Sequence, residues 1–368
     1  MSAAIRGAAF AIDSAAEQVL QALRRRGFEQ VQVTVSDTLR CELNLAHNEP
    51  SLLRSNEARK LSATGIVAGR RASSEGSDLG PAGVAALVDQ IWSSAQSAPV
   101  DEANAVSTGQ LLRLRRGPQQ ADPPALAAAL RQLLDWRAAH TPTMMIEEAL
   151  AAHVRSRSHT LTSGGSVIDC ELGWCEMSVF GLARDAGQTS SFNFAGGSAE
   201  TLTEVPTLFG IDRMMRELTQ QVHTQPLGER FVGDVVLAPG AVTDLLGWLM
   251  GQLRDGPLID GSSLFRNRVG DRVASPLLTL RSRYDAPGCA PLSADAFVTP
   301  AVTLLDAGHL TQLTPSLYGS RKTGLAHRPV AADGWELVAG STPLAEVIAA
   351  VPRGALVDRL SLNNTATN

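Results

Sequence analysis

Apolar residues follow a helical period near the N-terminus and then alternate with polar residues. Across residues 14–26 they recur on one helical face, and arginines fill the last turn before Gly27. This pattern predicts an amphipathic helix that ends at the glycine. Val31, Val33 and Val35 then alternate with polar residues, which is the period of a half-buried strand.

Further strand patterns follow and extend a sheet beside this helix. Alternating runs predict strands at residues 40–45 and 58–68. Pro81 begins an apolar helix that stops before Pro99. We therefore predict a helix packed on an antiparallel sheet, followed by a linker across residues 99–124.

The middle of the chain continues to switch between the two periods. An apolar face predicts a helix over residues 125–139, and short alternating runs predict a meander of strands over residues 144–194. A further amphipathic helix is expected over residues 206–224. Residues 1–228 are therefore predicted to form an N-terminal α+β domain with helices on an antiparallel sheet.

After Gly228 the pattern changes. A short strand is predicted at residues 235–237, and a Pro-Gly turn leads into a helix over residues 241–253. Many short β runs broken by glycine and proline come next. We expect residues 229–368 to form a mostly β C-terminal domain, which makes the fold class α+β.

Charge and hydropathy argue against a nucleic-acid-binding, membrane-spanning or secreted protein. The net charge is −5 and the isoelectric point is near 5.8, so no field is present that would hold a nucleic acid. No stretch approaches the eighteen uncharged apolar residues of a membrane span. The N-terminal residues have no continuous apolar core of the kind that a signal peptide needs. We expect a soluble, cytoplasmic protein that binds neither nucleic acid nor membrane.

The seven histidines and four cysteines do not form a recognisable metal or catalytic motif. No histidine pair occurs as HExxH or HExxxH. His153 and His159 share a predicted strand but lie six residues apart, about 20 Å along it. Cys170 and Cys175 have no second cysteine pair, so buried inert thiols are favoured over a zinc knuckle. No GxSxG, Walker A loop or GxGxxG after a strand is present. We predict no catalytic residue and no metal site in this chain.

An ordered series of segments carries a family resemblance. The strand, turn and helix of residues 58–95 come first, followed by the middle stretch 161–188. Residues 235–280 hold a strand, a helix and a glycine-serine turn, and residues 304–329 and 337–351 complete the series. Taken in order, these segments resemble the TldD/PmbA family over most of the chain.

The two branches of that family differ on the helix after Pro239 and Gly240. In the TldD branch this helix bears HExxxH, which supplies two zinc-binding histidines and a catalytic glutamate. Here residues 246–256 read LGWLMGQLRDG, which resembles the TldE/PmbA branch without the motif. The resemblance implies a subunit that holds no cofactor itself and pairs with a TldD-like zinc-binding protein to process or mature peptides. A homodimer stays open, and sheet edges could bind an extended peptide by strand addition.

Two departures from the family pattern affect this interpretation. An acidic turn of the family is replaced by residues 294–300, where Asp295 is the remaining carboxylate and a surface loop is favoured. The chain ends in SLNNTATN, residues 361–368, where relatives continue into further strands. Missing strands would leave a sheet edge that needs cover, which favours a partner.

The best-matched turns provide the candidate cleft-lining residues. These are Ser262, Ser263, Thr323 and Gly324, although turn chemistry explains such residues equally well. Two other functions stay open beside the metallopeptidase subunit. One is a diverged tailoring enzyme in a peptide or small-molecule pathway, and the other is a peptide-binding regulatory module without catalysis.

Overall fold

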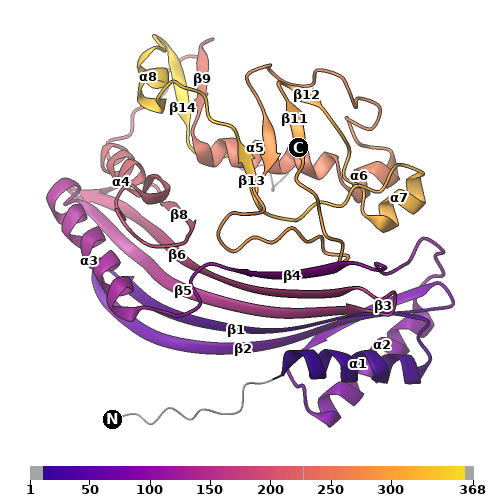
Figure 1. Ribbon diagram of the computed structural model, residues 1–368. Coiled ribbons are helices and arrows are strands. Elements are labelled where there is room, and N and C mark those ends of the chain that lie inside the picture. The colour runs from indigo at the N-terminus through magenta and orange to yellow at the C-terminus, as the bar shows by residue number, and fades with distance from the viewer. Residues whose placement is uncertain (1–10, 227, 361–368) are drawn as a thin grey trace, which may run out of the picture. The chain divides into compact units, whose positions relative to one another are not determined.

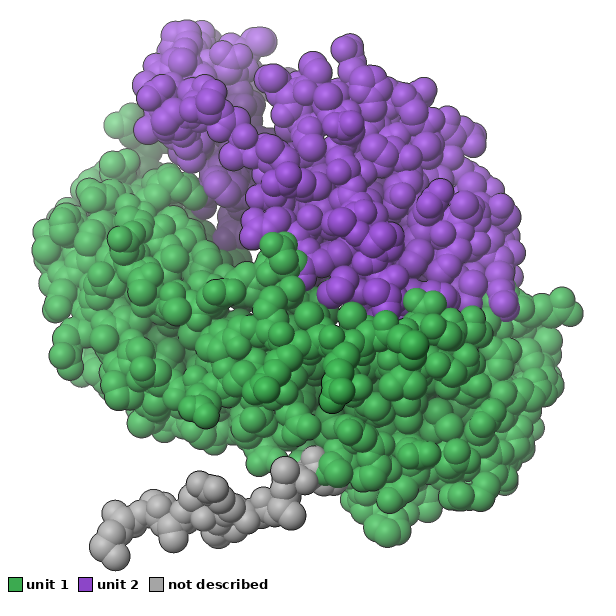
Figure 2. All heavy atoms as spheres, in the orientation of Figure 1, with its two compact units in different colours: residues 1–225, 285–290 green, residues 226–284, 291–368 purple. Residues whose placement is uncertain are grey.

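A computed structural model describes residues 11–226 and 228–360. The chain forms two compact units, shown in different colours in Figure 2. The first comprises residues 1–225 and 285–290, and the second comprises residues 226–284 and 291–368. The short return segment 285–290 is held in the first unit by Arg116, whose guanidinium donates to the carbonyl oxygens of Ala286 and Cys289.

The first unit is built on one strongly curved sheet of long strands (Figure 1). Its strands run in the order β3-β2-β1-β5-β6-β4, with β7 and β8 also paired to β6. Neighbouring strands are antiparallel except β4, which pairs parallel to β6. The strands are β1 Gln30–Ala46, β2 Glu49–Val67, β3 Arg70–Gly76, β4 Leu111–Arg116, β5 Met144–Thr162, β6 Val167–Asp185, β7 Gln188–Thr189 and β8 Asn193–Ala199.

Helices cover this sheet near both ends of its strands (Figure 1). Helices α1 and α2 share one core with the valines of β1, and α3 and α4 share a second core with β5, β6 and β8. Helix α1 ends at Gly27, which takes a φ of 115° and donates its N–H to the carbonyl oxygens of Leu23 and Arg24. The helices are α1 Ile12–Arg26, α2 Pro81–Ser97, α3 Pro123–His140 and α4 Ile211–Gln220.

The helix predictions at residues 14–26, 81–98 and 125–139 are confirmed, but three local predictions are wrong. The strands expected at 31–35 and 40–45 are one strand, because Asp37 pairs with arginines of both neighbouring strands and Thr38 hydrogen-bonds Ser156 across the sheet. The linker over residues 99–124 contains β4, which continues the sheet beside β6. The helix expected over residues 206–224 begins only at Ile211, because Phe209 and Gly210 have positive φ.

The second unit contains short strands and short helices. A four-stranded sheet has the order β12-β11-β10-β13, and β9 pairs parallel with β14. The α+β fold class is confirmed, with strands of two to four residues between the helices of this unit. The elements are β9 Asp234–Leu237, α5 Pro239–Gln252, α6 Asp255–Asp260, β10 Leu280–Ser282, β11 Thr303–Asp306, β12 His309–Leu310, α7 Leu317–Thr323, β13 Trp335–Leu337, α8 Leu344–Ala349 and β14 Gly354–Val357.

The described residues include no helix with the length and apolar character needed to cross a bilayer. The C-terminal sequence SLNNTATN, on which a missing sheet edge was inferred, lies outside the described residues, as do residues 1–10.

A buried carboxylate ties the polar middle of β1 to its neighbours. Glu42 accepts hydrogen bonds from Arg40 and Arg54, and Arg40 also bonds Glu176 at 2.7 Å. Only 4% of the Glu42 side chain is exposed. Burial raises the pKa of this carboxyl, but the two arginine hydrogen bonds outweigh burial and hold the pKa below its ordinary value.

We predict that Glu42→Gln lowers the free energy of unfolding by about 2 kcal/mol at pH 7. A depressed pKa stabilises the fold above the ordinary glutamate pKa, and this stabilisation is lost as the pH falls through the folded value. The difference between Glu42→Gln and the parent should therefore shrink in acid. Urea unfolding at pH 7 and pH 3 measures it. Glu75→Gln is the control, because Glu75 forms an exposed pair with Lys60 that should contribute little.

Candidate functional site

A largely apolar cavity lies beside α5 in the second unit. Its volume is about 700 Å³, within the usual range for ligand sites. One wall is the α5 face that carries Leu246, Gly247, Met250 and Gly251, and the opposite wall comes from β10 and β13. We call this cavity the α5 groove. The groove is lined by Leu237, Pro239, Val242, Thr243, Leu246, Gly247, Met250, Gly251, Arg254, Leu280, Ala332, Asp333, Gly334, Trp335, Leu337 and Leu344.

Helix α5 begins at a proline directly after β9 and leaves most of its apolar residues only partly buried or exposed. Strand β9 ends at Leu237, and Pro239 occupies the first helical position, where its missing N–H costs nothing. The helix is apolar on more than one side, and Ala241 is its one fully buried residue. An apolar helix that is not buried needs a ligand or another surface to cover it.

The chemistry of the lining is that of a binding surface. Zinc in proteins is held by imidazole, thiolate or carboxylate groups, and the lining offers one such side chain, Asp333. Its other charged group is Arg254. The groove can therefore bury apolar groups, with one charge of each sign at its border.

Ser262 and Ser263 lie in the turn after α6 and do not border the α5 groove. Ser262 is exposed. The Ser263 hydroxyl donates to the carbonyl oxygen of Gln252 at 2.7 Å and accepts from the N–H of Phe265 at 3.2 Å. Ser263 thus ties this turn to the end of α5.

Thr323 and Gly324 form the C-terminal end of α7. The Thr323 hydroxyl donates to the carbonyl oxygen of Gly319 at 2.7 Å. Gly324 has a φ of 73° and donates its N–H to the carbonyl oxygen of Ser320, a helix end that favours glycine. These contacts give all but Ser262 a structural role, and cleft lining by the four residues stays a prediction.

Two carboxylates organise the start of α7, and the sequence patterns indicated neither role. Asp255 accepts from both the N–H and the hydroxyl of Ser316, the N-cap of α7. Asp295, expected in a surface loop, is half-buried and accepts from the N–H of Leu317 at 3.1 Å. The nearby His327 ring is half-buried. Burial lowers its pKa, although the charges of both carboxylates act in the opposite direction.

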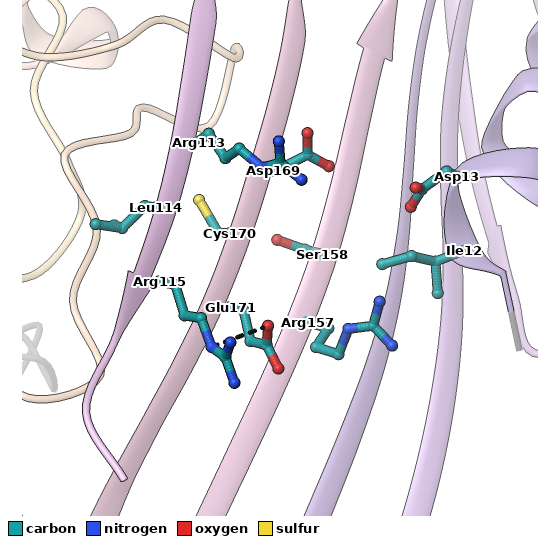
Figure 3. Close-up of a pocket in the computed structure, with 10 residues that line it drawn as sticks. All are labelled: Ile12, Asp13, Arg113, Leu114, Arg115, Arg157, Ser158, Asp169, Cys170 and Glu171. Atoms are coloured by element: carbon teal, nitrogen blue, oxygen red, sulfur yellow. Dashed lines mark ion pairs between the residues drawn. The ribbon is translucent and has the colours of Figure 1, made fainter. Parts of the chain in front are cut away.

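A second, smaller cavity of about 360 Å³ lies on the sheet of the first unit (Figure 3). His159 is buried beside it, with Nδ1 2.5 Å from Asp169 and 4.0 Å from Asp13. Among the described residues, these three form the one group whose ligand atoms lie close enough to share a metal ion. Arg113 and Arg157 line the same cavity, and their positive charges oppose a cation there.

The two cysteines and the other strand histidine considered in the sequence analysis are buried or half-buried in the first unit. Burial raises the pKa of the Cys170 thiol to about 11 and also raises that of Cys175, so neither is a thiolate at neutral pH. His153 is buried, and its Nε2 lies 2.8 Å from the carbonyl oxygen of Pro118. The favoured interpretation of Cys170 and Cys175 as inert thiols agrees with their burial.

We predict that Gly247→Ala raises the free energy of unfolding by about 0.5–1 kcal/mol, because alanine lowers the conformational entropy of the unfolded chain and favours the helix interior. A Cβ added at Gly247 meets no atom within 4 Å. Urea unfolding measures the change. Gly261→Ala should do the opposite, since Gly261 ends α6 with a φ of 74° that alanine adopts only with strain.

Solved structures of other proteins share this fold, and three of them are compared with this chain. TldE from Thermococcus kodakarensis is 18% identical with a TM-score of 0.73, and the match covers 94% of this chain and 83% of that one. A candidate modulator of DNA gyrase from Bacteroides thetaiotaomicron is 16% identical with a TM-score of 0.76, and the match covers 94% of this chain and 81% of that one. A candidate modulator of DNA gyrase from Thermotoga maritima is 13% identical with a TM-score of 0.65, and the match covers 90% of this chain and 78% of that one.

The sequence comparison concerns the second unit. Residues 231–367 match the family model of the PmbA/TldA metallopeptidase C-terminal domain. No curated protein gives a significant match. The family model accounts for the region that contains α5, and the fold similarity extends over at least nine-tenths of the chain. Residues 231–367 therefore carry the C-terminal domain of the PmbA/TldA metallopeptidase family, and the chain as a whole shares the fold of these solved structures.

Proposed function

We propose that this chain is the TldE-like subunit of a cytoplasmic, two-subunit peptide-processing metallopeptidase. It pairs with a TldD-like protein that holds the zinc, and it contributes a binding surface for the peptide. Neither nucleic acid nor membrane takes part.

One observation carries this proposal. In the TldD branch, to which the sequence was compared, the helix after the Pro-Gly turn supplies the zinc ligands and the base. Here the face of that helix toward the groove presents Leu246, Gly247, Met250 and Gly251, which offer neither a zinc ligand of the usual kind nor a group that accepts a proton at neutral pH. A cavity of about 700 Å³ is kept beside it. The combination fits a subunit that binds without catalysing.

Reconstitution of the activity tests this function. The chain and a TldD-like protein with HExxxH are purified separately and together, and cleavage of fluorescently labelled casein is followed with and without a chelator. We expect cleavage by the pair, loss of cleavage with the chelator and none by this chain alone. Chelator-resistant cleavage by the isolated chain would overturn the proposal and favour a diverged enzyme. Equal cleavage by the partner with and without this chain would also contradict it.

A further inference from the structure

We infer that the α5 groove accepts one large apolar side chain of an extended peptide, seated over Gly247 and Gly251. This inference rests on the proposed role of the chain in binding peptides. It goes further by assigning the site that selects the side chain and the residues that set its size.

The two glycines form a recessed floor. They lie four residues apart on α5 and therefore on one helical face. A Cβ added at either position meets no atom within 4 Å, so close packing does not require glycine there. Neither has a positive φ, so backbone conformation does not require it either. Their shared effect is open space above the helix, which a ligand group can fill.

The walls of the groove are suited to an apolar group. Leu246 and Met250 flank the glycines on α5, and Trp335 and Leu337 face them from β13. The flexible thioether of a methionine adapts to side chains of different shape. Burying a phenylalanine or leucine side chain among such groups is favourable in proportion to the apolar area removed from water.

An unpaired strand edge lies beside the groove and favours a peptide as the occupant. Strand β13 pairs with β10 on one side and has no strand on the other among the described residues. The carbonyl of Gly334 accepts from the N–H of Arg283, and the N–H of Val338 donates to the carbonyl of Thr279, at the two ends of β10. By the antiparallel alternation, the backbone groups of Trp335 and Leu337 face the free edge. A peptide paired there can place a side chain in the groove, as in strand addition.

The border charges agree with a peptide rather than a wholly apolar molecule. Arg254 and Asp333 are both exposed and both border the groove. An occupant therefore has an apolar part near the glycines and polar parts near the border. An extended peptide with one large apolar residue has this distribution.

Fluorescence anisotropy with two labelled peptides tests the inference. The host is a ten-residue peptide of serine, threonine and glycine, and its central residue is either phenylalanine or serine. We expect the co-purified pair to bind the phenylalanine peptide at least about tenfold more tightly, because a large apolar side chain leaves water. Equal affinities would overturn the inference. An N-methylated phenylalanine peptide should also bind weakly, and unchanged binding would contradict pairing with β13.

Variants identify the site. Gly251→Leu should abolish the preference for phenylalanine, because its side chain fills the groove. Gly256→Leu is the matched control, since an added Cβ there also meets no atom within 4 Å but the residue does not line the groove. A preference that survives Gly251→Leu would contradict the assignment. Zinc content and co-purification of each variant are measured in parallel, and the isolated chain is titrated as well. If the chain does not pair with its partner, the proposed function is wrong. If the pair forms but does not prefer the phenylalanine peptide, the assignment of the groove is wrong.

Discussion

Gly173→Ala should destabilise the first unit by about 3 kcal/mol or more. Gly173 lies on β6 where the turn after β4 crosses it, and a Cβ there would lie against the carbonyl oxygen of Pro118. A Cβ at Gly117 would in turn lie against the carbonyl oxygen of Gly173. Backbone cannot move aside as a flexible side chain can, so the methyl group must push the turn away from the sheet. That movement also disturbs the bond of His153 to Pro118.

Urea unfolding followed by circular dichroism measures this effect, because the sheet of the first unit contributes most of the strand signal. Gly76→Ala is the matched control. Gly76 also lies in the sheet, and its added Cβ would meet Leu87 at 3.4 Å, an ordinary contact. If Gly173→Ala and Gly76→Ala unfold at the same urea concentration, the turn after β4 does not contact β6 as closely as described.

Asp255→Ala should loosen α7 by about 2–4 kcal/mol, because two donors on Ser316 then lose a charged acceptor. Helix α7 also packs directly on this carboxylate, since a Cβ at Gly319 would collide with it. Loss of the carboxylate leaves a gap beside a helix of seven residues, which has little stability of its own.

Hydrogen exchange of the α7 amides measures this loosening. We expect faster exchange across Leu317–Thr323 in Asp255→Ala and unchanged exchange in α1. Asp260→Ala is the control, because Asp260 is an exposed residue at the end of α6. Unchanged α7 exchange in Asp255→Ala would show that Asp295 and the Ser316 cap suffice to hold the helix.

Much of the first unit could be predicted because its signals are local. The helix over residues 14–26 has a periodic apolar face, charged ends and a terminal glycine, and the valines of β1 alternate strictly. Strand β4 escaped detection because its six residues include three arginines, and its position depends on pairing with β6, more than fifty residues later. Long-range pairing of this kind leaves no local period in the sequence.

The candidate site was only partly predictable, for the same reason. The sequence identified the α5 helix and its lack of zinc ligands, because both are properties of one short segment. The groove depends on β13 and on Leu344, which lie more than eighty residues further along the chain. The capping role of Asp255 depends on Ser316, sixty-one residues away. A glycine-serine turn suggested Ser262 and Ser263 as site residues, whereas no sequence pattern indicated a role for Asp255.

The zinc content of the purified chain, alone and after co-expression with a TldD-like partner, shows which subunit holds the metal. We expect about one zinc ion per co-purified pair and no stoichiometric zinc in the chain alone, because the α5 face toward its groove carries no usual zinc ligand. Stoichiometric zinc in the isolated chain would contradict a subunit without a metal site. The group formed by Asp13, His159 and Asp169 would then be the first place to mutate.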